Sequence, residues 1–355
     1  MRIGILSYPM LFQRDGGLQV QVRETIAALN ALAGAGLEAG LVDPNTERLD
    51  QYNLIHVFSA INGNYRIVES AREMGVPVVL SPLVSPGWNR ASGLCADFAG
   101  RITGRLTGWQ VQTSFAQAKR AVQLADLLLA LGDAERNAIV SAFRVEASRI
   151  RVLPNGVAAR FFEAGPELFR KETGIAGPFV LMVAALTPYK NQLGLAQAMR
   201  GLELPLVLIG RCGVGDSAYL RALRQLPWVR WLGELPHESP LLASAYAAAS
   251  VAALPSQGEV FPLSVLEALA AGTPAVMTAE SALQLDDGGM ALRRVAWDDA
   301  AAQREALRAF AASPPPRAAV RKLVERYSWQ KVAADIAACY GEVAKRPGCR
   351  AVEGR

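Results

Sequence analysis

The sequence predicts an α/β protein built from two successive doubly wound sheets, and three observations lead to this prediction. Short apolar runs alternate with helical patterns along most of the 355 residues. The runs are continuously apolar, as expected for parallel strands that are covered on both faces. The alternation pauses between Val157 and Pro178, where two Gly-Pro pairs interrupt it, and then resumes. A chain of this length is sufficient for two domains of ordinary size.

The expected elements follow from the apolar runs and from the helix-forming stretches between them. In the first half we expect helices at 19–33 and 66–75 and strands at 2–8, 37–43, 53–59, 76–82, 125–132 and 149–156. In the second half we expect strands at 179–185, 204–210, 229–235, 250–256 and 273–279, again with helices between them. The predicted organisation is an N-terminal domain at 1–160, a linker at 161–177, a second domain at 178–326 and a C-terminal helix at 327–346 that packs back on the first domain.

The composition and the charge exclude several classes of protein. The formal net charge of +5 is spread over both halves, so no basic tail for nucleic acid is predicted. The cysteines lack CxxC spacing and the two histidines lie far apart, so neither a zinc site nor a disulfide framework is expected. The start, MRIGILSYPM, has the pattern of a strand rather than of a secretion signal. We therefore expect a cytoplasmic protein, with peripheral contact at the inner face of the membrane as an open alternative.

Two glutamates, Glu259 and Glu267, stand in the stretch GEVFPLSVLEALAAGTPAV. The stretch follows an expected strand, and Pro262 stands where proline is favoured, in the first turn of a helix. Gly272 ends that helix, so we expect Glu259 just before it and Glu267 about two turns in. A helix N-terminus suits phosphate, and carboxylates can accept hydroxyls of a sugar or ribose. The alternative is a pair of glutamates on a solvated surface.

The same stretch resembles the donor-site motif of family 4 retaining glycosyltransferases, in which two glutamates have this spacing. Four further segments match that family in order along nearly the whole chain: DGGLQVQVRETIAALNALAGAG, ADLLLALGDAERN with RIRVLPNGV, TPYKNQ, and YSWQKVAADIAACY. The resemblance implies a GT-B fold, in which two Rossmann-like domains face each other across a cleft. It also implies sugar transfer from a nucleotide-diphosphate donor, a UDP- or GDP-sugar, with retention of configuration and without a metal or other cofactor.

The resemblance also assigns roles to residues of the donor site. Glu267 would hydrogen-bond the ribose, Glu259 would hold hydroxyls of the transferred sugar, and Lys190 would neutralise the leaving diphosphate. A fixed positive group there stabilises the charge that develops as the glycosyl–phosphate bond breaks. Lys190 and Glu259 are therefore the predicted catalytic residues. The donor would also be lined by the backbone of Val260, Phe261, Pro262, Leu263 and Ser264, and faced from the first domain by Gly16 and Gly17.

The sequence departs from the family pattern at two places. An arginine usually precedes the lysine by five residues, and Ala185 stands there instead. Arg211, after the expected strand at 204–210, could replace it, and a surface role is an equal alternative. A histidine usually follows the strand at 76–82, and there is none near Leu83. His56 lies on an earlier strand, and a structural role in the core is the favoured interpretation for it.

The segment from Arg90 to Arg120 carries five basic residues and one acidic residue, with Trp109 and Phe115 among them. The favoured interpretation is a solvated helix face with aromatic side chains in the core. The alternative is an amphipathic surface at a bilayer that holds a lipid-linked acceptor.

Two hypotheses about function remain. The first is a glycosyltransferase that acts on a glycan, a lipid-linked or another acceptor. The second is a catalytically silent subunit of the same fold that binds sugar nucleotides or serves in assembly. Hydrolysis of a donor would distinguish the two.

Overall fold

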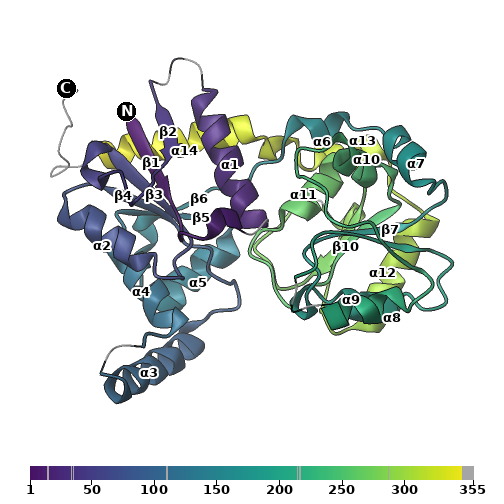
Figure 1. Ribbon diagram of the computed structural model, residues 1–355, viewed down its shortest axis with the longest axis horizontal. Helices are drawn as coiled ribbons and strands as arrows, with labels where there is room; N and C mark the ends of the chain where they lie inside the picture. The colour runs from purple at the N-terminus through teal and green to yellow at the C-terminus, as the bar shows by residue number, and fades with distance from the viewer. Residues whose placement is uncertain are drawn as a thin grey trace. The chain divides into compact units, whose positions relative to one another are not determined.

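The computed structural model describes residues 1–13, 16–32, 34, 36–108, 111–213, 215, 217–286 and 288–345. The chain forms two compact units (Figure 1). Unit 1 combines residues 1–155 with the chain from Trp329 onward, and unit 2 is Gly156–Ser328. Each unit contains one six-stranded parallel sheet. Within the described part of the chain, no helix has the length and apolar character needed to cross a membrane.

The sheet of unit 1 has the strand order β2-β1-β3-β4-β5-β6. Strands β3, β4 and β5 are wholly buried, as parallel strands between two layers of helices must be. The order reverses at β1, because β2 lies on one side of it and all later strands lie on the other. The strands are β1 (Arg2–Leu6), β2 (Glu38–Leu41), β3 (Leu54–Phe58), β4 (Val78–Ser81), β5 (Leu127–Ala130) and β6 (Ile150–Val152).

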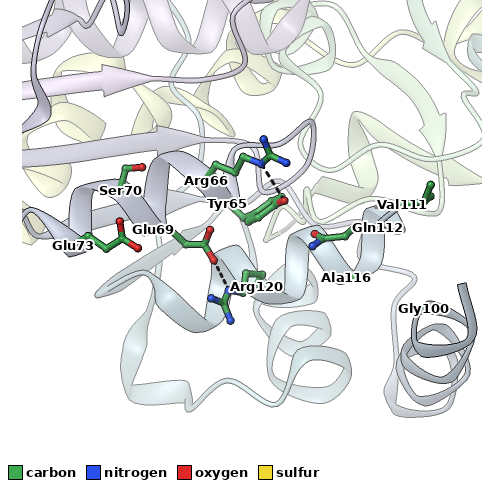
Figure 2. Close-up of a pocket in the computed structure, with 10 residues that line it drawn as sticks. All are labelled: Tyr65, Arg66, Glu69, Ser70, Glu73, Gly100, Val111, Gln112, Ala116 and Arg120. Carbon is green, nitrogen blue, oxygen red and sulfur yellow. Dashed lines mark hydrogen bonds and ion pairs between the residues drawn. The ribbon is translucent and has the colours of Figure 1, made fainter. Parts of the chain in front are cut away.

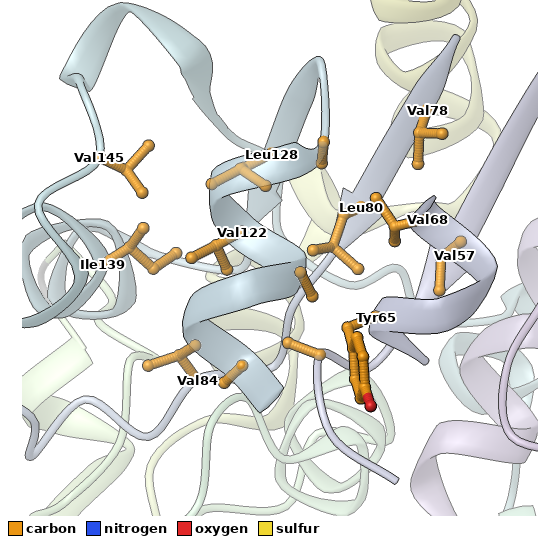
Figure 3. Packing of buried hydrophobic residues seen from close by; sticks show 14 of the residues in the cluster. Val57, Tyr65, Val68, Val78, Leu80, Val84, Val122, Leu128, Ile139 and Val145 are labelled. Carbon is orange, nitrogen blue, oxygen red and sulfur yellow. The ribbon is translucent and has the colours of Figure 1, made fainter. Parts of the chain in front are cut away.

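Helices cover both faces of this sheet, with α1 and α14 packed together on one face and α2, α4 and α5 on the other (Figure 1). On the second face, Leu80 and Leu128 of the strands meet Val68 of α2, Val122 of α4 and Ile139 of α5 in one apolar cluster (Figure 3). The helices of unit 1 are α1 (Gly17–Asn30), α2 (Tyr65–Glu73), α3 (Arg90–Leu106), α4 (Ser114–Leu124), α5 (Asp133–Phe143) and α14 (Trp329–Ala344).

The sheet of unit 2 has the strand order β12-β11-β10-β7-β8-β9 and reverses between β7 and β10. Its edge strand β12 is absent from the strands expected from the sequence. Arg293 and Arg294 occupy its centre and are exposed, so no continuous apolar run marks it, and pairing with β11 defines it. The strands are β7 (Val180–Val183), β8 (Leu206–Ile209), β9 (Val229–Trp231), β10 (Val251–Leu254), β11 (Ala275–Thr278) and β12 (Leu292–Val295).

The segment expected to be a linker, 161–177, is built into unit 2 instead. Its helices α6 and α7 pack on α10, where Phe161 and Phe169 are fully buried. The backbone N–H of Phe169 donates to Ser244 Oγ at 2.9 Å. Gly165-Pro166 therefore marks the start of α7, and Gly177-Pro178 precedes β7, so the segment between the two pairs is not a free connection. The helices of unit 2 are α6 (Ala159–Glu163), α7 (Glu167–Thr173), α8 (Gln192–Ala198), α9 (Ser217–Arg224), α10 (Pro240–Ala248), α11 (Leu263–Ala270), α12 (Ala300–Ala312) and α13 (Arg317–Lys322).

The chain enters and leaves unit 2 at neighbouring positions. The backbone N–H of Val157 donates to Tyr327 O at 2.7 Å, and Val157 pairs with Ser328 in a parallel bridge. After this bridge the chain continues into α14, which belongs to unit 1.

Helix α14 is joined to the sheet of unit 1 through a buried histidine. His56 of β3 is fully buried, with Nδ1 2.7 Å from Tyr340 Oη of α14 and Nε2 2.9 Å from Ser81 Oγ. Burial lowers the pKa of His56 to about 3, so the imidazole is neutral at physiological pH. The structure therefore places His56 in the core, in agreement with the structural role favoured from the sequence.

Candidate functional site

In unit 2, the loops after β7 and β10 meet at the carboxyl edge of the sheet, at the point where the strand order reverses. Doubly wound sheets bind ligands at this place. Lys190 lies in the loop after β7, and Glu259 lies in the loop after β10. The Nζ atom of Lys190 is 2.6 Å from Oε1 of Glu259, and the two side chains are 26% and 13% exposed. The fold thus brings the two predicted catalytic residues together as a partly shielded ion pair.

Hydrogen bonds hold these two loops against each other. The backbone N–H of Gln257 donates to Tyr189 O at 3.0 Å, and Tyr189 Oη donates to Gly258 O at 2.8 Å. Burial, and then the charges of Glu259 and Glu280, raise the pKa of Tyr189, so its hydroxyl stays protonated and can donate. The backbone directly before Glu259 is therefore fixed to the loop that carries the lysine.

Helix α11 starts in the immediate continuation of this loop. Pro262 is its N-cap residue, with φ −74° and ψ 113°, and its side chain makes no capping hydrogen bond. The helix begins at Leu263, so Glu267 lies little more than one turn in, rather than the two turns expected. An N-terminus without a side-chain cap can present its N–H groups to an anion. Along the predicted lining, Phe261 and Pro262 are buried, whereas Val260, Leu263 and Ser264 are partly exposed.

Glu267 is only 5% exposed, and both of its oxygens have partners inside unit 2. Its Oε1 is 2.7 Å from His237 Nε2, and its Oε2 accepts from Tyr246 Oη at 2.7 Å. His237 Nδ1 lies 2.8 Å from Nη2 of Arg160. Burial, and then the charge of Glu267, raise the pKa of Tyr246 well above its usual value, which keeps the phenol a donor. Four side chains thus form one continuous hydrogen-bonded network.

Three members of this network, Arg160, His237 and Tyr246, were not predicted from the sequence. His237 carried a usable signal, since it is a lone histidine that follows the strand β9. Tyr246 reaches Glu267 from α10, Arg160 reaches His237 from α6, and only tertiary packing brings those helices together. Each carboxylate oxygen can accept more than one hydrogen bond. Glu267 therefore keeps the capacity to accept a ribose hydroxyl while the network holds it.

The two positions considered for a second phosphate-binding cation lie on adjacent loops. Ala185 is exposed in the loop after β7. Arg211 follows β8, and its carbonyl accepts from the N–H of Leu186 at 2.8 Å, so its backbone runs beside that loop. Gly210 permits this close approach, because its φ is 149° and a Cβ there would lie 2.0 Å from the carbonyl oxygen of Ala184. The backbone of Arg211 thus lies next to the loop that carries Lys190.

In unit 1, Gly16 and Gly17 lie at the start of α1, after the strand β1 where the order reverses. Among the residues that the structure describes, a Cβ at either position would meet no atom within 4 Å. Packing against these residues therefore does not require glycine there. Gly16, the N-cap residue of α1, makes no side-chain capping hydrogen bond. The preceding loop residues 14 and 15 lie outside the described residues, and the contact of Gly17 with a donor stays a prediction.

The loop after β4, where the family has a histidine, is fixed by a buried carboxylate instead. Leu83 has a left-handed φ of 55°. Glu135, in the first turn of α5, is fully buried and accepts the N–H groups of Val84 and Leu131, each at 2.7 Å. Burial raises the pKa of Glu135 to about 7, and these N–H donors oppose the rise only in part. One side chain that the sequence analysis did not single out thus anchors the loops after both β4 and β5.

A separate cavity of about 570 Å³ lies in unit 1 beside α2 and α4 (Figure 2). Its basic groups have internal partners, since Arg120 Nε donates to Glu69 Oε1 at 2.5 Å and Arg66 Nε to Tyr65 Oη at 3.2 Å. None of the predicted site residues lines it. The lining residues are Tyr65, Arg66, Glu69, Ser70, Glu73, Gly100, Val111, Gln112, Ala116 and Arg120. We therefore place the candidate site at the sheet edge of unit 2 rather than in this cavity.

The segment 90–120 forms two helices, α3 and α4, with different surroundings. Phe115 of α4 is buried in the core, as expected, and Trp109 lies outside the described residues. Phe98 of α3, which the sequence analysis did not single out, is 67% exposed.

Comparison with known proteins finds a family match within unit 2 and similar proteins over a larger part of the chain. Residues 177–312 match the family described as glycosyl transferases group 1. The chain is similar to the D-inositol 3-phosphate glycosyltransferase of Kineococcus radiotolerans, with 27% identity over 272 residues, which cover 70% of this chain and 60% of that protein. The corresponding protein of Xylanimonas cellulosilytica is 30% identical over 258 residues, which cover 65% and 60%. The match thus spans about 60% of the length of these curated relatives.

Solved structures share the fold over almost the whole chain. HepE of Anabaena, crystallised in complex with UDP, aligns with a TM-score of 0.71 at 17% identity, over 96% of this chain and 100% of that chain. WaaG, a glycosyltransferase involved in lipopolysaccharide biosynthesis, aligns with a TM-score of 0.65 at 16% identity, over 96% and 99%. The two parallel sheets and these likenesses confirm the predicted GT-B fold. The chain is thus a GT-B protein whose residues 177–312 carry the glycosyl transferases group 1 match.

Proposed function

We propose that this protein is a family 4 retaining glycosyltransferase that moves a sugar from a nucleotide-diphosphate donor, without a metal. The observation that carries the proposal is the Lys190–Glu259 ion pair at the reversal point of the sheet of unit 2. A cation and a carboxylate beside an uncapped helix N-terminus match a ligand that carries both phosphates and hydroxyls. HepE has been crystallised with UDP and with UDP-glucose, which supports a UDP-sugar among the candidate donors.

In this proposal both residues of the ion pair, Lys190 and Glu259, contact the donor during the reaction. Negative charge develops on the diphosphate as its bond to the sugar breaks, and the ammonium of Lys190 and the N–H groups at the start of α11 stabilise it. Glu259 accepts sugar hydroxyls, and Glu267 accepts those of the ribose from within its network. Arg211, whose backbone lies beside the Lys190 loop, is the proposed second cation, and Gly16 and Gly17 of unit 1 are proposed as further donor-binding residues.

The acceptor is proposed to be a glycan or a lipid-linked molecule, and the protein is proposed to work in the cytoplasm, with peripheral contact to the membrane through residues 90–120. No nucleic-acid partner is proposed, because the net positive charge is small and spread over both halves.

The second candidate function is a silent subunit that binds sugar nucleotides without transferring the sugar. Two observations favour it. Ala185 supplies no cation where the family pattern has one, and Glu259 already balances the charge of Lys190. A subunit of this kind would bind donors without turning them over.

The test is turnover of UDP- and GDP-sugars by the full chain and by Lys190→Ala. The interaction strengthens as the bond breaks, so the variant should lose on the order of a hundredfold in turnover. Lys171→Ala, which removes an exposed lysine of α7, is the matched control and should retain full turnover. Melting temperatures measured with each donor report binding separately.

Near-normal turnover by Lys190→Ala would remove the lysine from the leaving-group role. Donor-dependent stabilisation of the unmodified protein without any turnover would favour the silent subunit. Neither binding nor turnover with any donor would contradict both functions.

A further inference from the structure

Helix α3 faces its own unit with small residues. Gly93 and Gly104 are its buried positions, and the helix packs on α4 and α5. A Cβ at Gly93 would lie 2.7 Å from the carbonyl oxygen of Ala142, and one at Gly100 would lie 3.3 Å from Thr113 Oγ1. The glycines therefore allow α3 to approach its neighbours closely, and this side of the helix leaves no room for large side chains.

The large apolar side chains of α3 point to the opposite side, into solvent. Leu94, Phe98, Ile102 and Leu106 follow each other at intervals of four residues, so they form one stripe along the helix. Their exposed fractions are 48%, 67%, 44% and 82%. A surface helix ordinarily turns such residues toward the core and its polar residues toward water. In α3 this arrangement is inverted, and the helix lies at the periphery of unit 1, away from the sheet (Figure 1).

Positive charge borders the apolar stripe. At 100° per residue, Arg101 and Arg105 lie beside Leu94 and Phe98 on the helix surface. Asp97 is the single acidic residue of α3, and it is engaged by Lys119 Nζ at 2.6 Å and by Arg101 Nη2 at 3.3 Å. The exposed side of α3 is therefore apolar along its centre and basic along one edge.

We propose that α3 is a membrane-docking helix that lies in the plane of an anionic lipid surface. In this arrangement the stripe Leu94, Phe98, Ile102 and Leu106 enters the boundary of the acyl chains, and the arginines contact lipid phosphates. The helix has 17 residues, so it is about 25 Å long, and its arginines keep it from entering the bilayer core.

The charges favour a lipid surface over a second copy of the chain. A second α3 would bring its own arginines toward these arginines, and the one aspartate on the helix is already engaged within its own unit. An anionic lipid surface provides both the apolar layer and the phosphates that this surface lacks. The proposal refines the membrane contact included in the proposed function, and it can be tested without any donor or acceptor.

The test is flotation of the full chain with vesicles of phosphatidylcholine, with and without 30% phosphatidylglycerol, at about 50 mM and 500 mM salt. We expect binding to the anionic vesicles at low salt and a marked loss at high salt, because salt screens the arginine–phosphate attraction. Phe98→Ser with Leu106→Ser should weaken binding at least about tenfold through lost apolar burial. Arg101→Gln with Arg105→Gln should weaken it roughly 25-fold, from about fivefold per arginine.

Leu168→Ser is the matched control, because Leu168 is an exposed apolar residue of α7 in unit 2, and it should bind vesicles like the unmodified protein. Lys190→Ala should also bind normally, which separates membrane docking from sugar transfer. The proposal is overturned if the unmodified chain does not bind anionic vesicles at low salt, or if the Phe98/Leu106 variant binds as well as the unmodified chain. It is equally overturned if sedimentation shows a dimer that this variant abolishes, since α3 would then be an interface between copies.

Discussion

At the scale of single residues, Glu267 combines a structural role with its proposed binding role. The sequence alone would suggest that Glu267→Ala weakens nucleotide binding and leaves the fold intact. In the structure, this change would deprive the buried hydroxyl of Tyr246 and the ring of His237 of their shared acceptor. A buried polar group that loses its partner costs about 1–3 kcal/mol. We therefore expect Glu267→Ala to lower stability as well as affinity.

Glu267→Gln separates the two roles. The amide keeps an oxygen acceptor, and its NH2 group can donate to the Tyr246 oxygen, so the network can rearrange around it. We expect this variant to retain most of its stability and to lose about tenfold or more in affinity for a nucleoside diphosphate, because a charge-assisted hydrogen bond is replaced by a neutral one. Calorimetric titration and urea unfolding measure the two effects. Glu172→Gln, at an exposed glutamate of α7, is the control; equal affinity in both variants would remove Glu267 from the ribose site.

Lys190 and Glu259 could be singled out from the sequence because each stands in a stretch that resembles a family 4 motif; their paired positions are observed, and their catalytic roles stay predictions. Lys190 and Glu259 each stand in a short stretch whose strand, loop and helix order can be recognised without the fold. The neighbours of Glu267 could not be predicted in this way. Arg160 and Tyr246 are separated from it by 107 and 21 residues; Tyr246 contacts it directly, and Arg160 is linked to it through His237.

At the scale of elements, α5 controls two loops at one edge of the sheet of unit 1 through Glu135. The pKa of this carboxyl is raised from 4.5 to about 7, mainly by burial. Between these values the folded protein keeps a proton that the unfolded chain releases. The contribution of Glu135 to stability is therefore fully present below pH 4.5 and is lost as the pH rises through 7.

Glu135→Gln removes this titration and keeps the shape of the side chain. We expect the difference in free energy of unfolding, wild type minus variant, to fall as the pH rises from 4.5 to 7, by a total on the order of 3 kcal/mol. Urea unfolding at a series of pH values measures it, and the titration of His56 cancels because both proteins share it. A difference that is constant, or that rises with pH, would show that the N–H donors of Val84 and Leu131 outweigh burial.

The elements that the sequence predicted well are those with continuous apolar runs, such as β3, β4 and β10. The strand β12 escaped prediction because two arginines interrupt its pattern at the sheet edge. Helices α6 and α7 were not predicted, because the Gly-Pro pairs around them were interpreted as a linker, although such pairs also occur beside short helices. For the segment that contains α3, the sequence left an amphipathic surface as the less favoured alternative, because periodicity identifies an apolar side of a helix and does not tell which surroundings that side meets.

At the scale of the whole molecule, the alternation of strands and helices predicted two parallel sheets, and the comparisons confirm the GT-B fold. The extent of each unit depends on packing that alternation cannot show. A fragment designed from the sequence alone would start near Pro178 and end near Arg326. Such a fragment lacks α6 and α7, and with them the buried side chains of Phe161 and Phe169 on α10.

We therefore expect a fragment of residues 156–328 to fold alone and a fragment of residues 178–326 to be much less stable. Loss of two buried phenylalanines from a core costs about 3–5 kcal/mol each, which is comparable to the whole stability of a domain. Circular dichroism and urea unfolding of the two fragments measure the difference. Equal stability would show that α6 and α7 are dispensable to unit 2.

The insertion of unit 2 between Val157 and Ser328 also affects the order in which the two units can fold during translation. A ribosome delivers all of unit 2 before it delivers α14, the last helix of unit 1. Residues 1–155 of unit 1 are therefore synthesised before α14 is available. Until then the surface of α1 that meets α14 stays uncovered, and His56 lacks its hydrogen bond to Tyr340. Synthesis of unit 1 begins before that of unit 2 and is completed after it. Between these two steps the nascent chain exposes an apolar surface that chaperones can bind.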